Sequence, residues 1–129
     1  MRVIVLMLLV LVSGGTAAEW VAFGGSDSGS FAIYVDPTIR RSGNMVKMWV
    51  MFDFKTTQEQ AGRRYLSQKE ESEYDCKDAR YRTIYFSWHS GNMGSGNTVY
   101  SDNRIPENWR PVAPVSVVED NWKAACGKQ

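Results

Sequence analysis

Histidine is almost absent from this sequence, which contains a single one, His89. A Ser-His-Asp or Cys-His catalytic pair could therefore be built only through that residue. An HExxH zinc motif, a Walker phosphate loop and a calcium-binding loop are also missing. His89 ends a strand-like segment and precedes a glycine-rich turn, so we expect a surface or partner-packing histidine. We predict no catalytic residue, no cofactor and no metal site.

An excess of charge of either sign is missing as well. The chain has 15 lysines and arginines against 14 aspartates and glutamates. A neutral domain has no electrostatic footprint for nucleic acid or anionic lipid, so we exclude both as partners. Acidic residues do cluster between Lys69 and Arg80, at Glu70, Glu71, Glu73, Asp75 and Asp78. The basic residues among them predict a solvated face rather than the paired carboxylates of a glycoside hydrolase.

Long apolar runs are also lacking. The run at residues 3–12 has ten residues, whereas a spanning helix needs about 20. Arg2 precedes this run and small residues follow it up to Ala18, which is the order of a secretory signal peptide. We expect residues 1–18 to be removed, with no membrane span in the mature chain, and export to the periplasm or to the cell surface or medium. Residues 19–129, which number 111, then form one domain.

Only two cysteines are present, Cys76 and Cys126, and they do not have CxxC spacing. An even count behind a signal peptide favours a disulfide, because the exported compartments are oxidising. Such a bond would close a loop of about 50 residues and stabilise the domain by an amount on the order of 4 kcal/mol. The alternative is a pair of free thiols with a redox role.

Most of the mature sequence alternates with the period of two that is typical of β-strands. Strands are predicted at residues 31–35, from residue 46 to residue 55, from Arg80 to His89, and at residues 98–100. Thr57 to Arg64 is predicted to be a loop or a short helical turn, followed by an extended, mostly solvated strand. Ser90 to Asn97 should form a long hairpin loop, and Asp102 to Pro114 should be irregular.

The period changes near the C-terminus. Ser116 and Glu119 have the spacing of a capping box, and Gly127 is placed to end a helix. Val118, Trp122, Ala125 and Cys126 then share one helical face. We therefore predict an α+β domain, an antiparallel β-sheet of five or six strands with a C-terminal α-helix packed on one face. The disulfide would tie this helix to the sheet.

Aromatic residues are abundant, with five tryptophans and six tyrosines. Four of them fall on the mixed rather than the apolar sides of their strands: Tyr34, Trp49, Tyr81 and Tyr85. Aromatic side chains on a partly solvent-exposed face of a sheet are typical of binding surfaces and homodimer interfaces. We predict such a surface here. The alternative is that a segment of the same chain, for example the one around Trp109, covers this face.

A series of short motifs resembles the surface-adhesin protein E family of proteobacteria. The matching stretches are Tyr34-Val35-Asp36 with Ile39-Arg40, Met48-Trp49-Val50-Met51-Phe52-Asp53, Tyr65-Leu66-Ser67-Gln68-Lys69, Tyr74-Asp75-Cys76, Arg80-Tyr81-Arg82, Ser90-Gly91-Asn92-Met93-Gly94, and Trp109 with Val112 to Pro114. The resemblance implies an antiparallel sheet with a C-terminal helix, the same cysteine bridge and a tendency to dimerise. It also implies display outside the cytoplasm and binding of host matrix and serum proteins such as vitronectin, laminin and plasminogen.

Three functional hypotheses follow. The first is an exported, non-enzymatic binding protein that presents a sheet face or the hairpin loop to a protein partner, either an extracellular-matrix or an envelope protein. The alternative is a secreted or periplasmic inhibitor of a hydrolase such as lysozyme, with Ser90 to Asn97 as the plugging loop. A third, a periplasmic enzyme or small-ligand carrier, would need a pocket with convergent polar groups.

Overall fold

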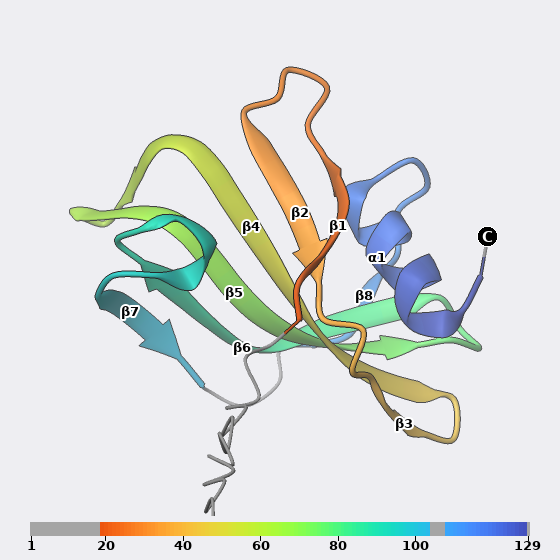
Figure 1. Ribbon diagram of the computed structural model, residues 1–129. Coiled ribbons are helices and arrows are strands. Elements are labelled where there is room, and N and C mark those ends of the chain that lie inside the picture. The colour runs from red at the N-terminus through yellow and green to blue at the C-terminus, as the bar shows by residue number, and fades with distance from the viewer. Residues whose placement is uncertain (1–18, 104–107, 129) are drawn as a thin grey trace, which may run out of the picture.

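The computed structural model describes residues 19–103 and 108–128, so the predicted signal peptide lies outside the described residues. Within them, eight strands form one sheet and a single α-helix follows near the C-terminus (Figure 1). The elements are β1 (Val21–Gly25), β2 (Phe31–Val35), β3 (Arg40–Ser42), β4 (Met45–Gln60), β5 (Arg63–Asp75), β6 (Arg80–His89), the 3-10 turn η1 (Asn92–Gly94), β7 (Thr98–Asp102), β8 (Arg110–Pro111) and α1 (Val117–Cys126).

The sheet is antiparallel throughout, as predicted. Its continuous path runs β1-β2-β4-β5-β6-β7, and the short strands β3 and β8 pair with β4 and β6 at the margins. The six strands of the path agree with the predicted five or six. The two additional strands have three and two residues, which is too short for a period of two to be recognised. One of them, β8, lies in the segment that we expected to be irregular.

The prediction of a loop or helical turn from Thr57 to Arg64 is wrong. Strand β4 continues to Gln60, and β5 begins at Arg63. The connecting residues, Ala61 and Gly62, both have positive φ angles, of 51° and 75°. A two-residue turn with positive φ at both positions matches the twist of a tight hairpin. The polar side chains before it therefore belong to a long, exposed hairpin tip rather than to a break in the strand.

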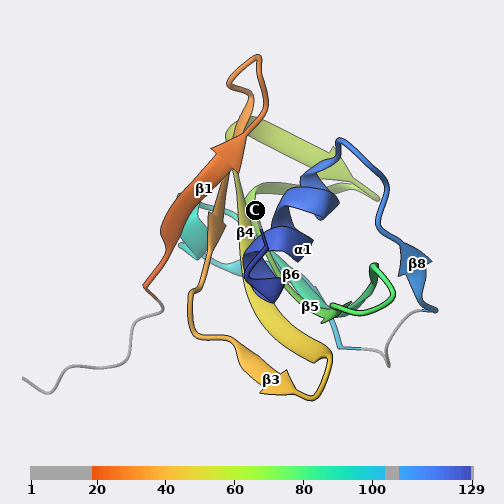
Figure 2. The same cartoon turned by 90° about the vertical axis from the view of Figure 1, so that its right-hand side faces the viewer.

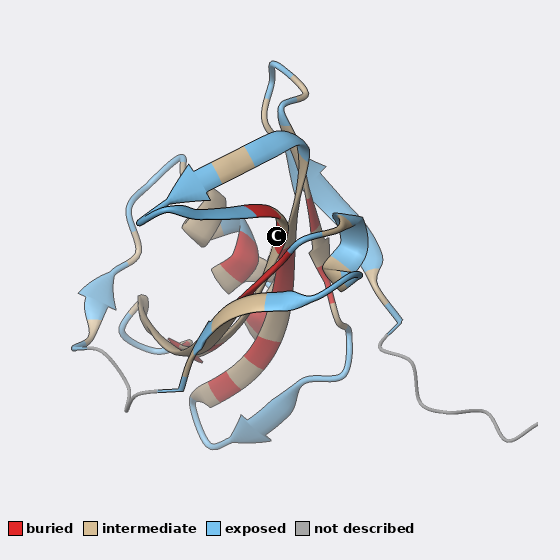
Figure 3. Ribbon diagram, turned by 90° about the vertical axis from the view of Figure 1, so that its left-hand side faces the viewer, coloured by how far each residue is buried: buried red, intermediate tan, exposed pale blue. Residues whose placement is uncertain are grey.

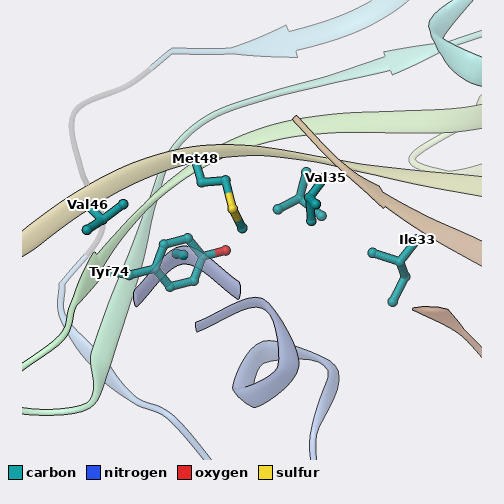
Figure 4. Packing of buried hydrophobic residues seen from close by; sticks show 7 residues of the cluster. Ile33, Val35, Val46, Met48 and Tyr74 are labelled. Atoms are coloured by element: carbon teal, nitrogen blue, oxygen red, sulfur yellow. The ribbon is translucent and has the colours of Figure 1, made fainter. Parts of the chain in front are cut away.

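Helix α1 lies inside the curl of the sheet and packs against β4 and β5 (Figure 2). The apolar side of β4 contributes Val46, Met48 and Val50, and β5 contributes Tyr74. Figure 4 shows several of these side chains gathered above the helix. Each is almost fully removed from solvent, and burial of such a side chain stabilises the fold by about 1.5–3 kcal/mol. Buried residues alternate with half-buried ones over residues 45–50 of β4, whereas β3 is exposed (Figure 3).

The ends of α1 follow the predicted signals closely. The Ser116 hydroxyl accepts a hydrogen bond from the Glu119 amide at 3.1 Å. The return bond differs from a capping box, because the Glu119 carboxylate accepts from the Val115 amide, at 3.4 Å. Gly127 ends the helix with a left-handed φ of 67°. Both signals are local in sequence, so they can be recognised without knowledge of the tertiary structure.

The disulfide between Cys76 and Cys126 is present and joins the end of β5 to the last residue of α1. A second link lies beside it, because the indole Nε1 of Trp122 donates to the Asp75 carbonyl at 2.9 Å. The helix is thus fastened to the sheet by a covalent bond and a hydrogen bond at the same end of β5.

Candidate functional site

The face of the sheet that is turned away from α1 contains the candidate binding residues. Alternate residues of β4 point to this side, and cross-strand pairing extends it over the neighbouring strands. We call it the open face. Its members are Tyr34 of β2; Lys47, Trp49, Met51 and Asp53 of β4; Ser67, Lys69, Glu71, Glu73 and Asp75 of β5; and Arg80, Arg82, Tyr85, Ser87 and His89 of β6.

Trp49 and Tyr85 form the centre of the open face. Glu71 lies in register with both of them, on the strand between their strands. The two rings meet edge to face, with centroids 5.5 Å apart and planes at 67°. Such a pair is worth about 0.5–1.5 kcal/mol beyond the area it buries. Both residues are only half-buried, so together they form an ordered aromatic platform that solvent can reach.

Tyr34 lies on the same side of the sheet, opposite Met51 in the pairing of β2 with β4. It too is half-buried. The structure therefore brings three of the four candidate aromatic residues onto one face. We call Tyr34, Trp49 and Tyr85 the aromatic strip.

Tyr81 does not belong to this strip, and the prediction that it shares a face with Tyr85 is wrong. Between the pairs Glu71–Tyr85 and Ser72–Thr83, the register of β5 and β6 shifts, so Ile84 has no partner. A β-bulge of this kind changes the side to which the following residues point. Tyr81 therefore packs against the core beneath α1. Nothing in the alternation of the sequence indicates the bulge.

The hairpin loop of residues 90–97 covers one end of the open face. Its backbone is held down by the Met93 amide, which donates to the Asp53 carboxylate at 2.8 Å, and by the Gly94 amide, which donates to the Ser67 hydroxyl at 2.8 Å. Met51, directly below, is fully buried. The loop thus lies flat on the sheet instead of projecting from it.

His89 is buried near this loop, so of the two expected settings, at the surface or packed against a partner, the surface one is wrong. Its Nε2 is hydrogen bonded to the Ser87 hydroxyl at 2.8 Å, and its Nδ1 faces the Thr98 hydroxyl at 3.5 Å. Burial, together with the charge of Lys69, lowers the pKa of His89. The ring is therefore neutral near pH 7. Its position depends on the pairing of β6 with β5 and β7, which the sequence does not reveal.

Trp109 covers the opposite end of the open face. Its ring lies against two guanidinium groups, 4.7 Å from that of Arg80 and 4.3 Å from that of Arg82. The alternative that this segment folds over the candidate surface is therefore correct for the margin of the face. The centre, with Trp49 and Tyr85, lies between the two covered ends.

The acidic cluster is only in part the solvated face that we expected, since Asp78 is exposed but most of the other members are not. Three of its carboxylates are ion-paired on the open face: Glu71 with Arg40, Glu73 with Arg82, and Asp75 with Arg80. Burial alone would raise the pKa of Asp75, but the hydrogen bonds from Arg80 and from the backbone amides of Asp78 and Lys77 outweigh it and lower that pKa. The partners come from β3 and β6, so only the strand register identifies them.

The described residues contain no group of three or more histidines, cysteines, aspartates or glutamates placed to hold a metal ion. Among the helices of these residues, none has the length and apolar character that crossing a bilayer requires.

Comparisons with known proteins agree with this architecture. A crystal structure of protein E from non-typeable Haemophilus influenzae superposes with a TM-score of 0.62 at 9% identity, covering 88% of this chain and 79% of that chain. A second crystal form of Haemophilus influenzae protein E gives a TM-score of 0.59 at 10% identity, covering 84% and 95%. At these identities the likeness concerns the fold alone.

The sequence itself gives the family. A comparison with curated proteins found no match. The sequence profile described as "Surface-adhesin protein E" matches residues 20–127, which is nearly the whole described chain. The chain therefore belongs to the surface-adhesin protein E family.

Proposed function

We propose that this protein is an exported, non-enzymatic adhesin that binds another protein through the aromatic strip of Tyr34, Trp49 and Tyr85. The observation that carries the proposal is the contact of Trp49 with Tyr85, which holds two large rings at the surface between two ends covered by the chain's own loops. Tryptophan and tyrosine are enriched among the residues that dominate binding energy at protein interfaces.

The family supports a partner outside the cytoplasm. Residues 1–18 act as the export signal, and the mature domain works in the periplasm or at the cell surface. Its partner is an extracellular-matrix or serum protein of a host, or a protein of the bacterial envelope.

The absence of enzymatic activity is part of the proposal. A histidine that serves as a general base must lie within hydrogen-bond reach of the substrate, directly or through one water, and in the Ser-His-Asp triad a carboxylate also orients it. Within the described residues the ring nitrogens of His89 face the hydroxyls of Ser87 and Thr98, and the ring is buried. This environment supports a structural role for the histidine.

Binding can be measured with immobilised vitronectin, laminin and plasminogen, and by capture from envelope extract. We expect Trp49→Ala and Tyr85→Ala each to weaken binding at least about tenfold, because central aromatic residues typically contribute 2 kcal/mol or more. Phe23→Ala is the matched control, since Phe23 is an exposed aromatic residue on the marginal strand β1. Failure to bind any protein from either source would overturn the proposal.

A second copy of the chain is a further candidate for the same strip, because a self-complementary patch on a two-fold axis forms a homodimer. Tyr85→Asp would place a charge in the middle of such an interface. Sedimentation of the wild-type protein as a dimer, and of Tyr85→Asp as a monomer, would support this assembly. A monomeric wild type would reject it.

The inhibitor hypothesis receives no support from the loop of residues 90–97. A plugging loop must project into an active site, whereas residues 92–94 of this loop are hydrogen bonded to Asp53 and Ser67 of the sheet. Unchanged lysozyme activity in the presence of excess protein is the expected result.

A further inference from the structure

The ion pairs of the open face have an unequal exposure that the net charge of the chain conceals. In each pair the side chain of the carboxylate is less exposed to solvent than that of the arginine, and we call these arginines the raised cations. The side-chain exposures are 63% for Arg40 against 13% for Glu71, 28% for Arg82 against 13% for Glu73, and 40% for Arg80 against 2% for Asp75. The pairs carry no net charge, but the groups that solvent mainly contacts are therefore their arginines.

The raised arginines retain donors for a ligand. A guanidinium group has five N–H donors in a planar fork that matches a carboxylate. The ion pair of Arg40 uses one of its terminal nitrogens, and that of Arg82 uses Nε and one terminal nitrogen. Further N–H groups on both side chains are thus left over after the internal pairs are made.

Lys47 adds a cation that no internal pair neutralises. It lies in register with Arg40 on one side and with Glu73 on the other, and within the described residues it has no ion-pair partner. Glu73 is already bound by Arg82. Positive charge therefore exceeds negative charge along this part of the sheet.

A hollow of about 150 Å³ lies among these groups. It is lined by Arg40, Arg41, Ser42, Met45, Lys47 and Glu73. This volume suits one small anionic group rather than a whole metabolite, because ligand pockets usually measure about 300–1,000 Å³. The turn that adjoins the hollow is tied to the end of β5, because the Cys76 amide donates to the carbonyl of Asn44 at 2.9 Å.

Aromatic rings border the raised cations on two sides. Trp109 stacks on Arg80 and Arg82, and Trp49 and Tyr85 occupy the neighbouring row of the sheet. A surface that combines arginine, tryptophan and tyrosine has the composition of a protein-binding hot spot.

From this arrangement we infer that the partner contributes an acidic polypeptide segment, whose carboxylates bind Arg40 and Lys47 while its neighbouring side chains pack on Trp49 and Tyr85. The inference rests on the proposed function and adds to it the chemistry of the partner. Arginine predominates among the raised cations, and its planar fork can bind a carboxylate through two parallel hydrogen bonds.

The test uses fluorescently labelled poly-L-glutamate as the probe and protein purified after expression of the full chain. Anisotropy at low ionic strength should show binding, and salt should weaken it because exposed charges are screened. Lys47→Glu should weaken binding about tenfold. Lys47 makes no ion pair, so this change leaves no buried carboxylate without its partner. Lys47→Met, which removes the charge without reversing it, should give a smaller loss in the same direction.

Lys55→Glu is the matched control. It makes the same change of charge on the same strand, roughly 25 Å away, and should alter binding less than about twofold. Equal losses from Lys47→Glu and Lys55→Glu would overturn the inference, because they would indicate a response to net charge alone. Absence of poly-L-glutamate binding would also overturn it.

A parallel binding measurement with heparin tests a different class of polyanion, a sulfated polysaccharide. Lys47-dependent binding of heparin without binding of poly-L-glutamate would assign the hollow to a sulfated polysaccharide and reject an acidic polypeptide. The proposed adhesin function can be distinguished from this partner chemistry by the capture experiment. Capture of a matrix or envelope protein that depends on Trp49 but not on Lys47 would uphold the adhesin and reject only this partner chemistry.

Discussion

The rings of Trp49 and Tyr85 touch although their strands, β4 and β6, do not pair with each other. Strand β5 lies between them and places Glu71 below the contact. The carboxylate of Glu71 is held there by Arg40 from β3. Four strands thus contribute to one small area, in which acidic groups lie low and aromatic and basic groups lie above them.

The ring contact predicts a measurable coupling between Trp49 and Tyr85. In a double-mutant cycle with Trp49→Ala and Tyr85→Ala, the free energies of unfolding should deviate from additivity by about 1 kcal/mol, because either single change already removes the contact. Urea denaturation measures this quantity. Phe23→Ala combined with Tyr85→Ala should be additive, since three strands, β2, β4 and β5, separate β1 from β6 in the sheet. Additivity of the first pair would contradict the contact.

Removing the disulfide should destabilise the domain without changing its fold. Cys76→Ala with Cys126→Ala should lower the free energy of unfolding by about 2–4 kcal/mol, because the bond closes a long loop in the unfolded chain. Urea denaturation of wild-type protein treated with a reductant should show a similar loss. Mass spectrometry of protein harvested from the envelope should find the two sulfurs oxidised, and free thiols there would contradict the bridge.

The hairpin loop makes Gly96 more sensitive to substitution than Gly62. Both have nearly the same positive φ, 76° and 75°, so the backbone strain of an alanine is similar. At Gly96 the new methyl would also lie 2.3 Å from the Ser90 hydroxyl and 3.1 Å from the Gly91 amide, whereas at Gly62 no atom lies within 4 Å. Gly96→Ala should therefore cost about 1 kcal/mol more than Gly62→Ala in urea denaturation. Equal losses would contradict the close packing of the loop.

Acid should weaken the domain through His89. Because the pKa of His89 is lowered in the folded state, the unfolded chain binds its proton first. The stability contributed by the neutral ring is complete above the unfolded pKa of about 6.5 and is lost as pH falls through it toward the lower folded pKa. Between about pH 7.5 and 5 the slope should not exceed about 1.4 kcal/mol per pH unit for this one group.

The control for the pH experiment is His89→Gln, which retains a hydrogen-bonding side chain without titrating in this range. Urea denaturation at several pH values should show a flatter profile for the variant than for the wild type. A wild-type profile as flat as that of the variant would contradict the burial of a neutral histidine.

The class of the fold follows from patterns that are local in the sequence. Alternation along β4 separated Val46, Met48 and Val50 from Lys47 and Trp49, because neighbouring side chains of a strand point to opposite sides whatever lies beyond it. The capping signals of α1 are equally local. The even cysteine count, together with the predicted export signal, was sufficient to predict the bridge.

The side chains that the open face presents, in contrast, depend on how the strands pair. A bulge at Ile84 places Tyr81 on the core side of the sheet. The pairing of β5 with β6 places Glu73 beneath Arg82 and buries His89. These outcomes depend on which residues meet across strands that are distant in the sequence. A shift of one residue in that register reverses every side chain, and the composition of each strand is the same before and after the shift.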